Sequence, residues 1–335
     1  MILVTGGTGL VGAHLLYDLC KEGRSCRAIF RDEKGLEGVK NLFMSYGDSS
    51  LNHYQKIEWI KTDILDLEGL KVAFKDIQTV YHCAAYISFD PKDFNKLTAV
   101  NVQGTANMVN LALDFKVEAF CYVSSIAALG KASREKPITE DTHWNIEDPN
   151  VYALSKYHAE LEVWRGIWEG LSAVIINPGV ILGAGFWDKG SGKLFAFAQK
   201  GSAFYFPGGA GFVGVLDVVN TMRQAVKEKK WNERYVCVAE HLSYKRLFEH
   251  MSEGFNLKKP TKEIPIWCLE ILWRLDFVKT RIFGGSRKIT KHTLRGLRHI
   301  DTYSAEKSIN ELGISYTPVN KVIIACCQYW KQQTG

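Results

Sequence analysis

Three absences narrow the classes of protein that this sequence can specify. Its eight cysteines show no paired spacing of the kind that zinc sites use, so we expect no metal centre. Cys26, Cys83, Cys121 and Cys237 lie inside apolar, strand-like runs, which favours buried free thiols in a reducing compartment. The net charge is only +6, from 42 basic and 36 acidic residues, so no nucleic-acid partner is expected.

Long uncharged apolar runs are also missing. Residues 264–275 form an apolar stretch, but Glu270 and Arg274 interrupt it, and it is too short to span a bilayer. The chain opens directly into an apolar run at Ile2, which leaves no room for a signal peptide before it. We therefore expect a cytoplasmic protein without a transmembrane segment.

A basic segment follows that apolar stretch. Between residues 279 and 298 the chain has no acid and seven basic residues, namely Lys279, Arg281, Arg287, Lys288, Lys291, Arg295 and Arg298. A solvated face is the most common reason for such a segment, and an anionic substrate or a membrane surface are the alternatives. Peripheral membrane contact through 264–298 therefore stays open.

The N-terminal glycines are the first positive signal. Gly6, Gly9 and Gly12 follow the apolar residues 2–4 and precede a run with helical spacing at 15–20. Only glycine lets a strand turn this sharply and bring a helix N-terminus close to a diphosphate. The order strand, glycine turn, helix predicts a dinucleotide site, and an ordinary glycine-rich turn is the alternative.

Apolar strand-like runs alternate with helical runs as far as residue 180. We expect further strands at 26–30, 57–60, 79–85, 119–123 and 173–176, and helices at 34–46, 100–113 and 152–168. This alternation predicts an α/β fold with a doubly wound parallel (Rossmann) sheet and ligands at the carboxyl ends of its strands. We assign 1–180 to a dinucleotide-binding domain, rejoined by parts of 212–240, and 181–335 to a smaller C-terminal α/β substrate-binding lobe.

Aromatic residues and glycines crowd the segment after residue 180. The rings are Phe186, Trp187, Phe204, Tyr205, Phe206 and Phe212. Large rings on a flexible framework suit a lid over a bulky apolar substrate, and ordinary core packing is the alternative for each ring.

The end of the second strand predicts the cofactor's phosphorylation state. Arg31 stands 19 residues beyond Gly12, where NAD-binding units usually carry a carboxylate for the ribose 2′-hydroxyl. A cation suits a 2′-phosphate better, so we expect NADP. Asp32 next to it keeps NAD open, and an exposed surface arginine is the structural alternative.

Tyr152 and Lys156 are four residues apart on a predicted helix, so they share one face. A free phenol has a pKa of about 10, and a neighbouring ammonium lowers it toward the working range. Ser125, at the end of the preceding strand, can polarise a carbonyl. The same spacing recurs from Tyr17 and from Tyr303, but only Tyr152 follows a strand that ends in two serines.

Together these motifs resemble the extended short-chain dehydrogenase/reductases, the group that includes NAD-dependent epimerases and dehydratases. The resemblance implies catalytic roles for Ser125, Tyr152, Lys156 and the helix residue Asn101. It implies cofactor contacts by the glycine turn, an adenine-contacting pair, a strand end beside the ribose and a segment beside the nicotinamide. These residues are Gly6, Thr8, Gly9, Leu10, Val11, Gly12, Asp63, Ile64, Ala84, Ala85, Pro178 and Ile181, with Tyr152 and Lys156.

Residues 152–160 are most similar to the branch of dihydroflavonol 4-reductases, cinnamoyl-CoA reductases and 3β-hydroxysteroid dehydrogenases. Ile126-Ala127 stands where the dehydratases have an Asp-Glu pair, and Gly211 stands where sugar-nucleotide enzymes often have an arginine. We expect an NADP(H)-dependent oxidoreductase that interconverts a carbonyl and a secondary alcohol on a bulky, largely apolar small molecule.

Two other functions stay open: a nucleotide-sugar 4-epimerase with tightly bound NAD, and a non-catalytic dinucleotide sensor. The resemblance also implies a homodimer that pairs through the helices at 101–115 and 152–168.

Overall fold

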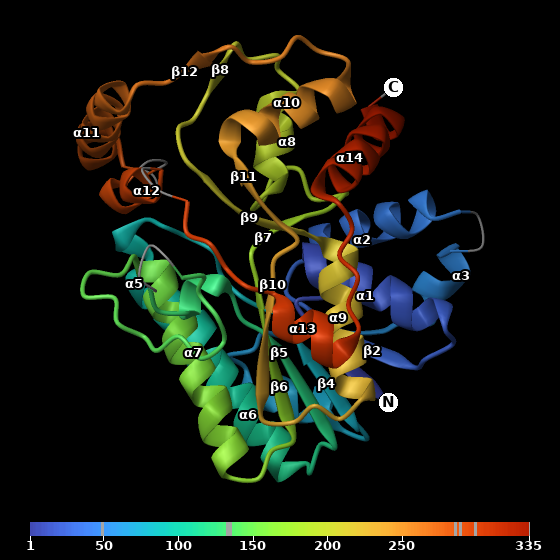
Figure 1. Ribbon diagram of the computed structural model, residues 1–335. Helices are drawn as coiled ribbons and strands as arrows, with labels where there is room; N and C mark the ends of the chain where they lie inside the picture. The colour runs from blue at the N-terminus through green and yellow to red at the C-terminus, as the bar shows by residue number, and fades with distance from the viewer. Residues whose placement is uncertain (48–49, 132–135, 285–286, 288–289, 298–299, 335) are drawn as a thin grey trace.

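A seven-stranded parallel sheet forms the centre of the protein (Figure 1). The computed structural model describes residues 1–47, 50–131, 136–284, 287, 290–297 and 300–334. The strands are β1 (Ile2–Thr5), β2 (Cys26–Phe30), β3 (Glu58–Lys61), β4 (Thr79–His82), β5 (Ala119–Val123), β6 (Ala173–Pro178) and β10 (Glu233–Cys237). Their order is β10-β6-β5-β4-β1-β2-β3, and every neighbouring pair is parallel. The expected doubly wound sheet is confirmed.

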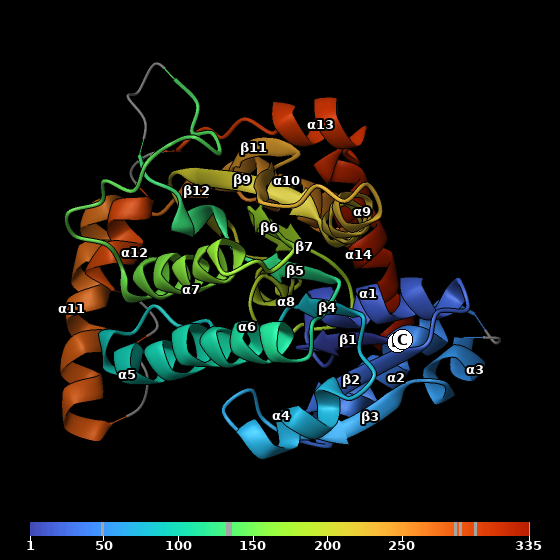
Figure 2. The ribbon, with the colours of Figure 1, turned by 90° about the horizontal axis from the view of Figure 1, so that it is seen from below.

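Two layers of helices cover the sheet (Figure 2). On one face lie α1 (Leu10–Lys21), α2 (Lys34–Ser45), α3 (Ser50–Gln55) and α9 (Val215–Lys227). On the other lie α4 (Leu67–Phe74), α6 (Gly104–Asp114) and α7 (Val151–Trp168). Successive β1 residues alternate between the two cores, since Val4 packs in the first and Leu3 in the second. Burial on both faces explains why the strands read as continuous apolar runs.

The rest of the chain builds a second core above the carboxyl ends of the strands (Figure 1). A small sheet has the order β11 (Glu240–Ser243), β9 (Gly209–Gly214), β7 (Val180–Leu182), and α8 (Gly192–Ala198), α10 (Tyr244–Phe255) and α14 (Val319–Thr334) pack beside it. Between β9 and β11 the chain returns to the main sheet through α9 and β10, which pairs with β6. The division of the chain at residue 180 stays a prediction.

The remaining elements are short or lie outside the two sheets. They are α5 (Phe94–Leu97), β8 (Phe204–Tyr205), β12 (Lys262–Glu263), α11 (Ile266–Phe283), α12 (Lys291–Gly296), α13 (Glu306–Leu312), the π-helical stretch Thr98–Gln103 and the short 3₁₀ turns 91–93 and 126–128. Among the described residues, no helix combines the length and apolar character needed to cross a membrane.

The aromatic segment after residue 180 packs mainly into the second core. Trp187 lies 4.8 Å from Trp330 between ring centroids, and Phe206 lies 6.2 Å from Phe248. Phe212 is fully buried. Trp187, Phe206 and Phe212 therefore pack in the core, which was the alternative to a lid over the substrate.

Candidate active site

The turn between β1 and α1 needs glycine at two positions. Gly6 has a φ of +67°, and a Cβ built on it would lie 2.7 Å from the backbone nitrogen of Ala84. A Cβ on Gly12 would lie 2.3 Å from the carbonyl oxygen of Gly6. The turn is therefore closed by direct contact of backbone on backbone, which is why the spacing of these glycines was informative in the sequence.

The N-terminus of α1 is available to an anion. Its N-cap is Gly9, which offers no side-chain hydrogen bond to the first turn. The amides of Leu10, Val11 and Gly12 are the first three of the helix and have no acceptor within it. Together with the helix dipole they suit the diphosphate of a dinucleotide. Thr8 borders the same turn and packs beside Gly35 in the first turn of α2.

Arg31 and Asp63, predicted separately as cofactor residues, lie together at the carboxyl ends of β2 and β3. Arg31 Nη1 is 3.5 Å from Asp63 Oδ2, and the Arg31 side chain is 64% exposed. An exposed pair of this kind stabilises the fold little, so Arg31 is free to reorient toward a phosphate. The Ile64 side chain is buried against α6 near Gly104, and its carbonyl accepts from Asn107 Nδ2 at 3.0 Å. Only the backbone N–H of Ile64 is therefore left for an adenine.

The segment after β4 passes close to the glycine turn. The backbone N–H of Ala84 donates to Thr5 Oγ1 at 3.2 Å, and Ala85 is exposed. Farther along the sheet edge, Pro178 ends β6 and Ile181 lies half-buried in β7. The predicted cofactor residues thus lie along one edge of the sheet, with Ile64 turned inward.

Tyr152 and Ser125 meet where α7 begins. Asn150 caps this helix, since its Oδ1 accepts from the N–H of Ala153 at 2.8 Å. Ser125 follows β5 in extended conformation, and its Oγ accepts from the N–H of Ala127 at 3.1 Å. Burial raises the pKa of Tyr152 to about 12, and the nearby Ser125 hydroxyl opposes that rise. At neutral pH the phenol is therefore protonated.

The ammonium of Lys156 is held by strand β5. Its Nζ donates to the Tyr122 hydroxyl at 2.7 Å and to the Val123 carbonyl at 2.9 Å, and the side chain is fully buried. Burial lowers the pKa of Lys156 to about 7, and the negative charge of Glu160 opposes this shift. The ammonium is thus bound to β5, and a lowering of the Tyr152 pKa by Lys156 stays a prediction.

Glu160 is a buried carboxylate on α7 for which the sequence predicts no role. Its carboxylate accepts from Ser124 Oγ at 2.6 Å and from Asn177 Nδ2 at 2.8 Å, and it pairs with Arg234 Nη1 at 2.9 Å. Asn177 also donates to the Ser125 carbonyl at 3.0 Å. Glu160 therefore ties α7 to the ends of β5 and β6. One signal was present, since it lies four residues after Lys156 on the same helix face.

Asn101 holds backbone and does not touch the reacting hydroxyls. It lies in a π-helical stretch, Thr98–Gln103, inside the region expected as a regular helix. Its Nδ2 donates to the Tyr86 carbonyl at 3.0 Å and to Ser155 Oγ at 2.9 Å, and its Oδ1 accepts from the Tyr86 N–H at 2.7 Å. These bonds fasten the segment after β4 to α7. We therefore correct its predicted catalytic role to a positioning role.

The two other Tyr/Lys pairs lie elsewhere. Tyr17 stacks on Tyr46 with ring centroids 3.9 Å apart. Tyr303 stacks on His241 at 6.2 Å, and Lys307 pairs with Glu233 at 2.5 Å. That Tyr152 and Lys156 form the catalytic pair stays a prediction.

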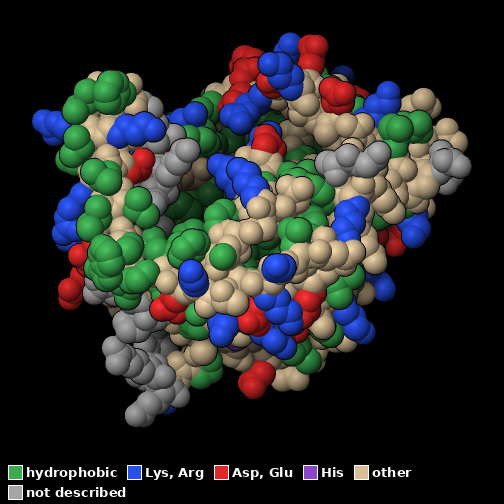
Figure 3. All heavy atoms as spheres, turned by 90° about the horizontal axis from the view of Figure 1, so that it is seen from above, with side chains coloured by type: hydrophobic (Ala, Val, Ile, Leu, Met, Phe, Trp, Pro, Cys, Tyr) green, Lys and Arg blue, Asp and Glu red, His purple; other side chains and the backbone are tan. Residues whose placement is uncertain are grey.

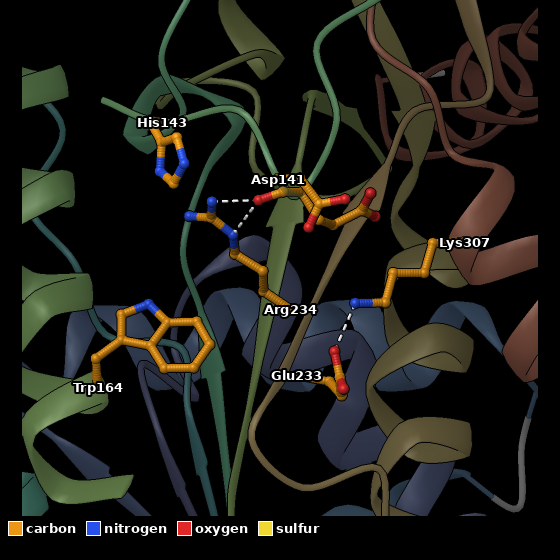
Figure 4. A pocket seen from close by; sticks show the side chains of 7 residues that line it. Asp141, His143, Trp164, Glu233, Arg234 and Lys307 are labelled. Atoms are coloured by element: carbon orange, nitrogen blue, oxygen red, sulfur yellow. Dashed lines mark hydrogen bonds and ion pairs between the residues drawn. The ribbon is translucent and has the colours of Figure 1, made fainter. Parts of the chain in front are cut away.

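A separate hollow of 410 Å³ opens beside the start of β10 (Figure 4). Its lining residues are Glu140, Asp141, His143, Trp164, Glu233, Arg234 and Lys307. The Arg234 guanidinium donates through Nε to the Glu140 carbonyl at 2.7 Å and reaches Glu160 through Nη1. Most charged groups of this hollow pair with one another or with Glu160. We therefore assign these residues a structural role.

The model of the NAD dependent epimerase/dehydratase family matches residues 2–237. A Synechocystis protein provisionally assigned as a dihydroflavonol 4-reductase is 28% identical, over 99% of this chain and 94% of its own. Sterol demethylase protein B of Methylococcus capsulatus is 25% identical, over 99% and 98% of the two chains. The crystal structure of the protein gox2253 has a TM-score of 0.82 at 27% identity, covering 100% of this chain and 98% of its own.

Proposed function

The chain belongs to the NAD dependent epimerase/dehydratase family and is an NAD(P)-dependent enzyme, and from this premise we propose a reaction. It interconverts a carbonyl and a secondary alcohol on a bulky, largely apolar small molecule, with NADP(H) as cofactor. The observation that carries the proposal is that the hydroxyls of Ser125 and Tyr152 lie close together, at the same edge of the sheet as a glycine turn that suits a dinucleotide.

The cofactor is held by the ends of the strands. The first amides of α1 bind its diphosphate, Arg31 binds the 2′-phosphate, and Asp63 with the backbone of Ile64 borders the adenine. Ala84 and Ala85 border the ribose, and Pro178 and Ile181 border the nicotinamide. When bound, the nicotinamide supplies or accepts the hydride.

The protein's own part of the reaction is proton transfer. Ser125 donates a hydrogen bond to the substrate oxygen and so favours the charge that develops there. Tyr152, protonated at neutral pH because burial raises its pKa to about 12, gives its proton to that oxygen during reduction. In the oxidative direction the same oxygen takes the proton back. Lys156, whose pKa burial lowers to about 7, supplies a positive charge behind the pair when it is protonated.

Apolar side chains border Tyr152 on the solvent side. The ring of Phe89 lies 5.4 Å from the Tyr152 ring, and 47% of Phe89 is exposed. Ile87, two residues earlier, is 55% exposed. These contacts favour an apolar substrate over a charged sugar nucleotide. We also propose that residues 181–335 supply most of the remaining substrate contacts.

Two further proposals concern assembly and location. Trp168 and Leu161 are exposed on α7, at 88% and 44%, and support a homodimer through α6 and α7. All eight cysteines are free, which supports a reducing, cytoplasmic location.

The test compares Tyr152→Phe with Tyr157→Phe, a change on the same helix at a ring that stacks on Trp144. We would follow NADPH consumption over a panel of aromatic and alicyclic ketones and aldehydes, and cofactor binding by fluorescence. Tyr152→Phe should bind cofactor but lose about 100-fold or more in kcat, and Tyr157→Phe should keep its rate. Undiminished turnover in Tyr152→Phe would refute the assigned role. NAD that copurifies, with no net NADPH consumption, would favour the epimerase.

A further inference from the structure

Helix α11 exposes a continuous apolar stripe. Its members recur at intervals of three or four residues, which places them on one face. They are Trp267, Ile271, Leu275, Val278 and Ile282, each between 49% and 68% exposed. Leu272 and Phe283 widen the stripe and, with Leu275, Val278 and Ile282, line a groove of 510 Å³. Soluble surfaces seldom leave so many large apolar side chains together.

The opposite face of α11 is anchored to the protein. Leu269 and Thr280 are buried, at 2% and 5% exposure. The Thr280 carbonyl accepts from Lys92 Nζ at 3.4 Å, and just beyond the helix the N–H of Arg287 donates to Asp90 Oδ2 at 2.7 Å. The stripe therefore faces away from the body. Figure 3 shows hydrophobic side chains gathered along the edge where Figures 1 and 2 place α11.

Basic side chains border the stripe on both sides. Arg274 and Arg281 lie along one edge by helical spacing. Lys279 lies on the other edge and lines the groove, as does the acidic Asp276. Glu270 pairs with Arg274 at 3.6 Å, within the same helix. Of the seven basic residues noted in the sequence, Lys288 and Arg298 lie outside the described residues and take no part in this argument.

We propose that this face of α11 docks on the surface of an anionic lipid bilayer. An apolar stripe edged by Lys and Arg, with a tryptophan at one end, is the pattern of a helix that lies in the interface plane. The basic edges, with Arg274, Lys279 and Arg281, provide charge complementarity to anionic headgroups. A second copy fits less well, because a two-fold contact would bring the same basic edges together.

The placement of the stripe connects it with the active site. The segment 88–93 touches α11 through Lys92, and through Asp90 it touches Arg287 just beyond the helix. Phe89 in the same segment packs against the Tyr152 ring. Docking would hold this side of the molecule against the lipid. The docking proposal does not depend on the proposed reaction, because it rests on α11 alone.

The experiment measures binding of the full chain to sedimenting vesicles. One set is pure phosphatidylcholine and the other an equal mixture with phosphatidylglycerol, both at low ionic strength. The wild type should bind the anionic vesicles about tenfold more tightly than the neutral ones, and added salt should reduce the difference. Val278→Asp should weaken binding to anionic vesicles about tenfold, through lost burial and added repulsion.

Val72→Asp is the matched control, since Val72 is a helical valine on α4 with 61% exposure and Val278 has 50%. It should bind as the wild type does. Absence of wild-type binding, or an equal loss in both variants, overturns the proposal. Light scattering adds a further check: a wild-type dimer that Val278→Asp dissociates, with no vesicle binding, would identify the stripe as an interface between copies.

Discussion

The ammonium of Lys156 lies 2.7 Å from the Tyr122 hydroxyl and 4.4 Å from the centroid of the Tyr122 ring. Tyr122 is itself held in place, since its ring stacks on His82 with centroids 5.4 Å apart. Strand β5, and not helix α7, therefore provides the acceptors that fix the position of the Lys156 ammonium. Tyr122 is a positioning residue for Lys156, and the first prediction tests that role.

Tyr122→Phe should lower the pKa of Lys156 further, because the buried ammonium loses one of its acceptors. If protonated Lys156 is needed for turnover, the alkaline fall in kcat should move from near pH 7 to lower pH by about one unit. The measurement is a pH–rate profile.

Tyr81→Phe provides the control for that profile. It removes a buried hydroxyl from the neighbouring strand β4, on the opposite face of the sheet. Its pH–rate profile should match the wild type. A profile of Tyr122→Phe that overlays the wild type would contradict the positioning role.

Glu160→Gln should destabilise the protein by about 3 kcal/mol. The change leaves the partly buried Arg234 without its counterion and disturbs the bonds from Ser124 and Asn177. Glu162→Gln, two residues away, breaks a surface pair with Arg165 and should cost under about 1 kcal/mol. The measurement is the free energy of unfolding of both variants in urea. Equal losses would contradict the inference that the buried contacts of Glu160 stabilise the fold more than a surface pair does.

Lys156→Met should change how stability depends on pH. The pKa of Lys156 is about 7 in the folded protein, below its unfolded value of about 10.4, so the unfolded chain binds more protons between these limits. Wild-type stability should therefore rise with pH above 7, by up to about 1.4 kcal/mol per unit from this group. Lys156→Met should lack this slope in urea titrations at pH 7, 8 and 9. Parallel wild-type and variant curves would show that folding does not lower the pKa of Lys156.

Local patterns predicted the parts of the site that depend on neighbours in the chain. The glycine turn and the Tyr152/Lys156 spacing are both short-range, because backbone geometry fixes them. The alternation of strands and helices likewise predicted the parallel sheet.

Long-range partners could not be predicted in the same way. Arg234 meets Glu160 from 74 residues away, and Tyr122 meets Lys156 from 34. Neither pair has a sequence signature, because folding alone brings the partners together. For the same reason the sequence could not show that the Lys156 ammonium bonds to β5. Nor could it show that burial raises the pKa of Tyr152.

Arg31→Ala should separate the two nicotinamide cofactors. Loss of a charged donor to the 2′-phosphate should weaken NADPH binding about tenfold and leave NADH binding within about twofold. Lys71→Ala removes an exposed cation that pairs with Glu68 on α4 and should change neither. Fluorescence titration with both cofactors is the measurement. A wild type that prefers NADH would overturn the interpretation of Arg31.

Gly12→Ala should disable the dinucleotide turn. The added Cβ would lie 2.3 Å from the Gly6 carbonyl oxygen, and the two backbones would have to separate. We expect a loss of about 2 kcal/mol or more in stability and a loss of cofactor binding. Gly38→Ala on α2 meets only Phe186, at 3.8 Å, so there the better helix former should be neutral or stabilise by up to about 1 kcal/mol. The measurement is thermal unfolding of both variants with and without NADPH. Gly38→Ala should keep the rise in Tm that the cofactor causes. A Gly12→Ala variant that also keeps this rise would show that the tight turn is not needed for cofactor binding.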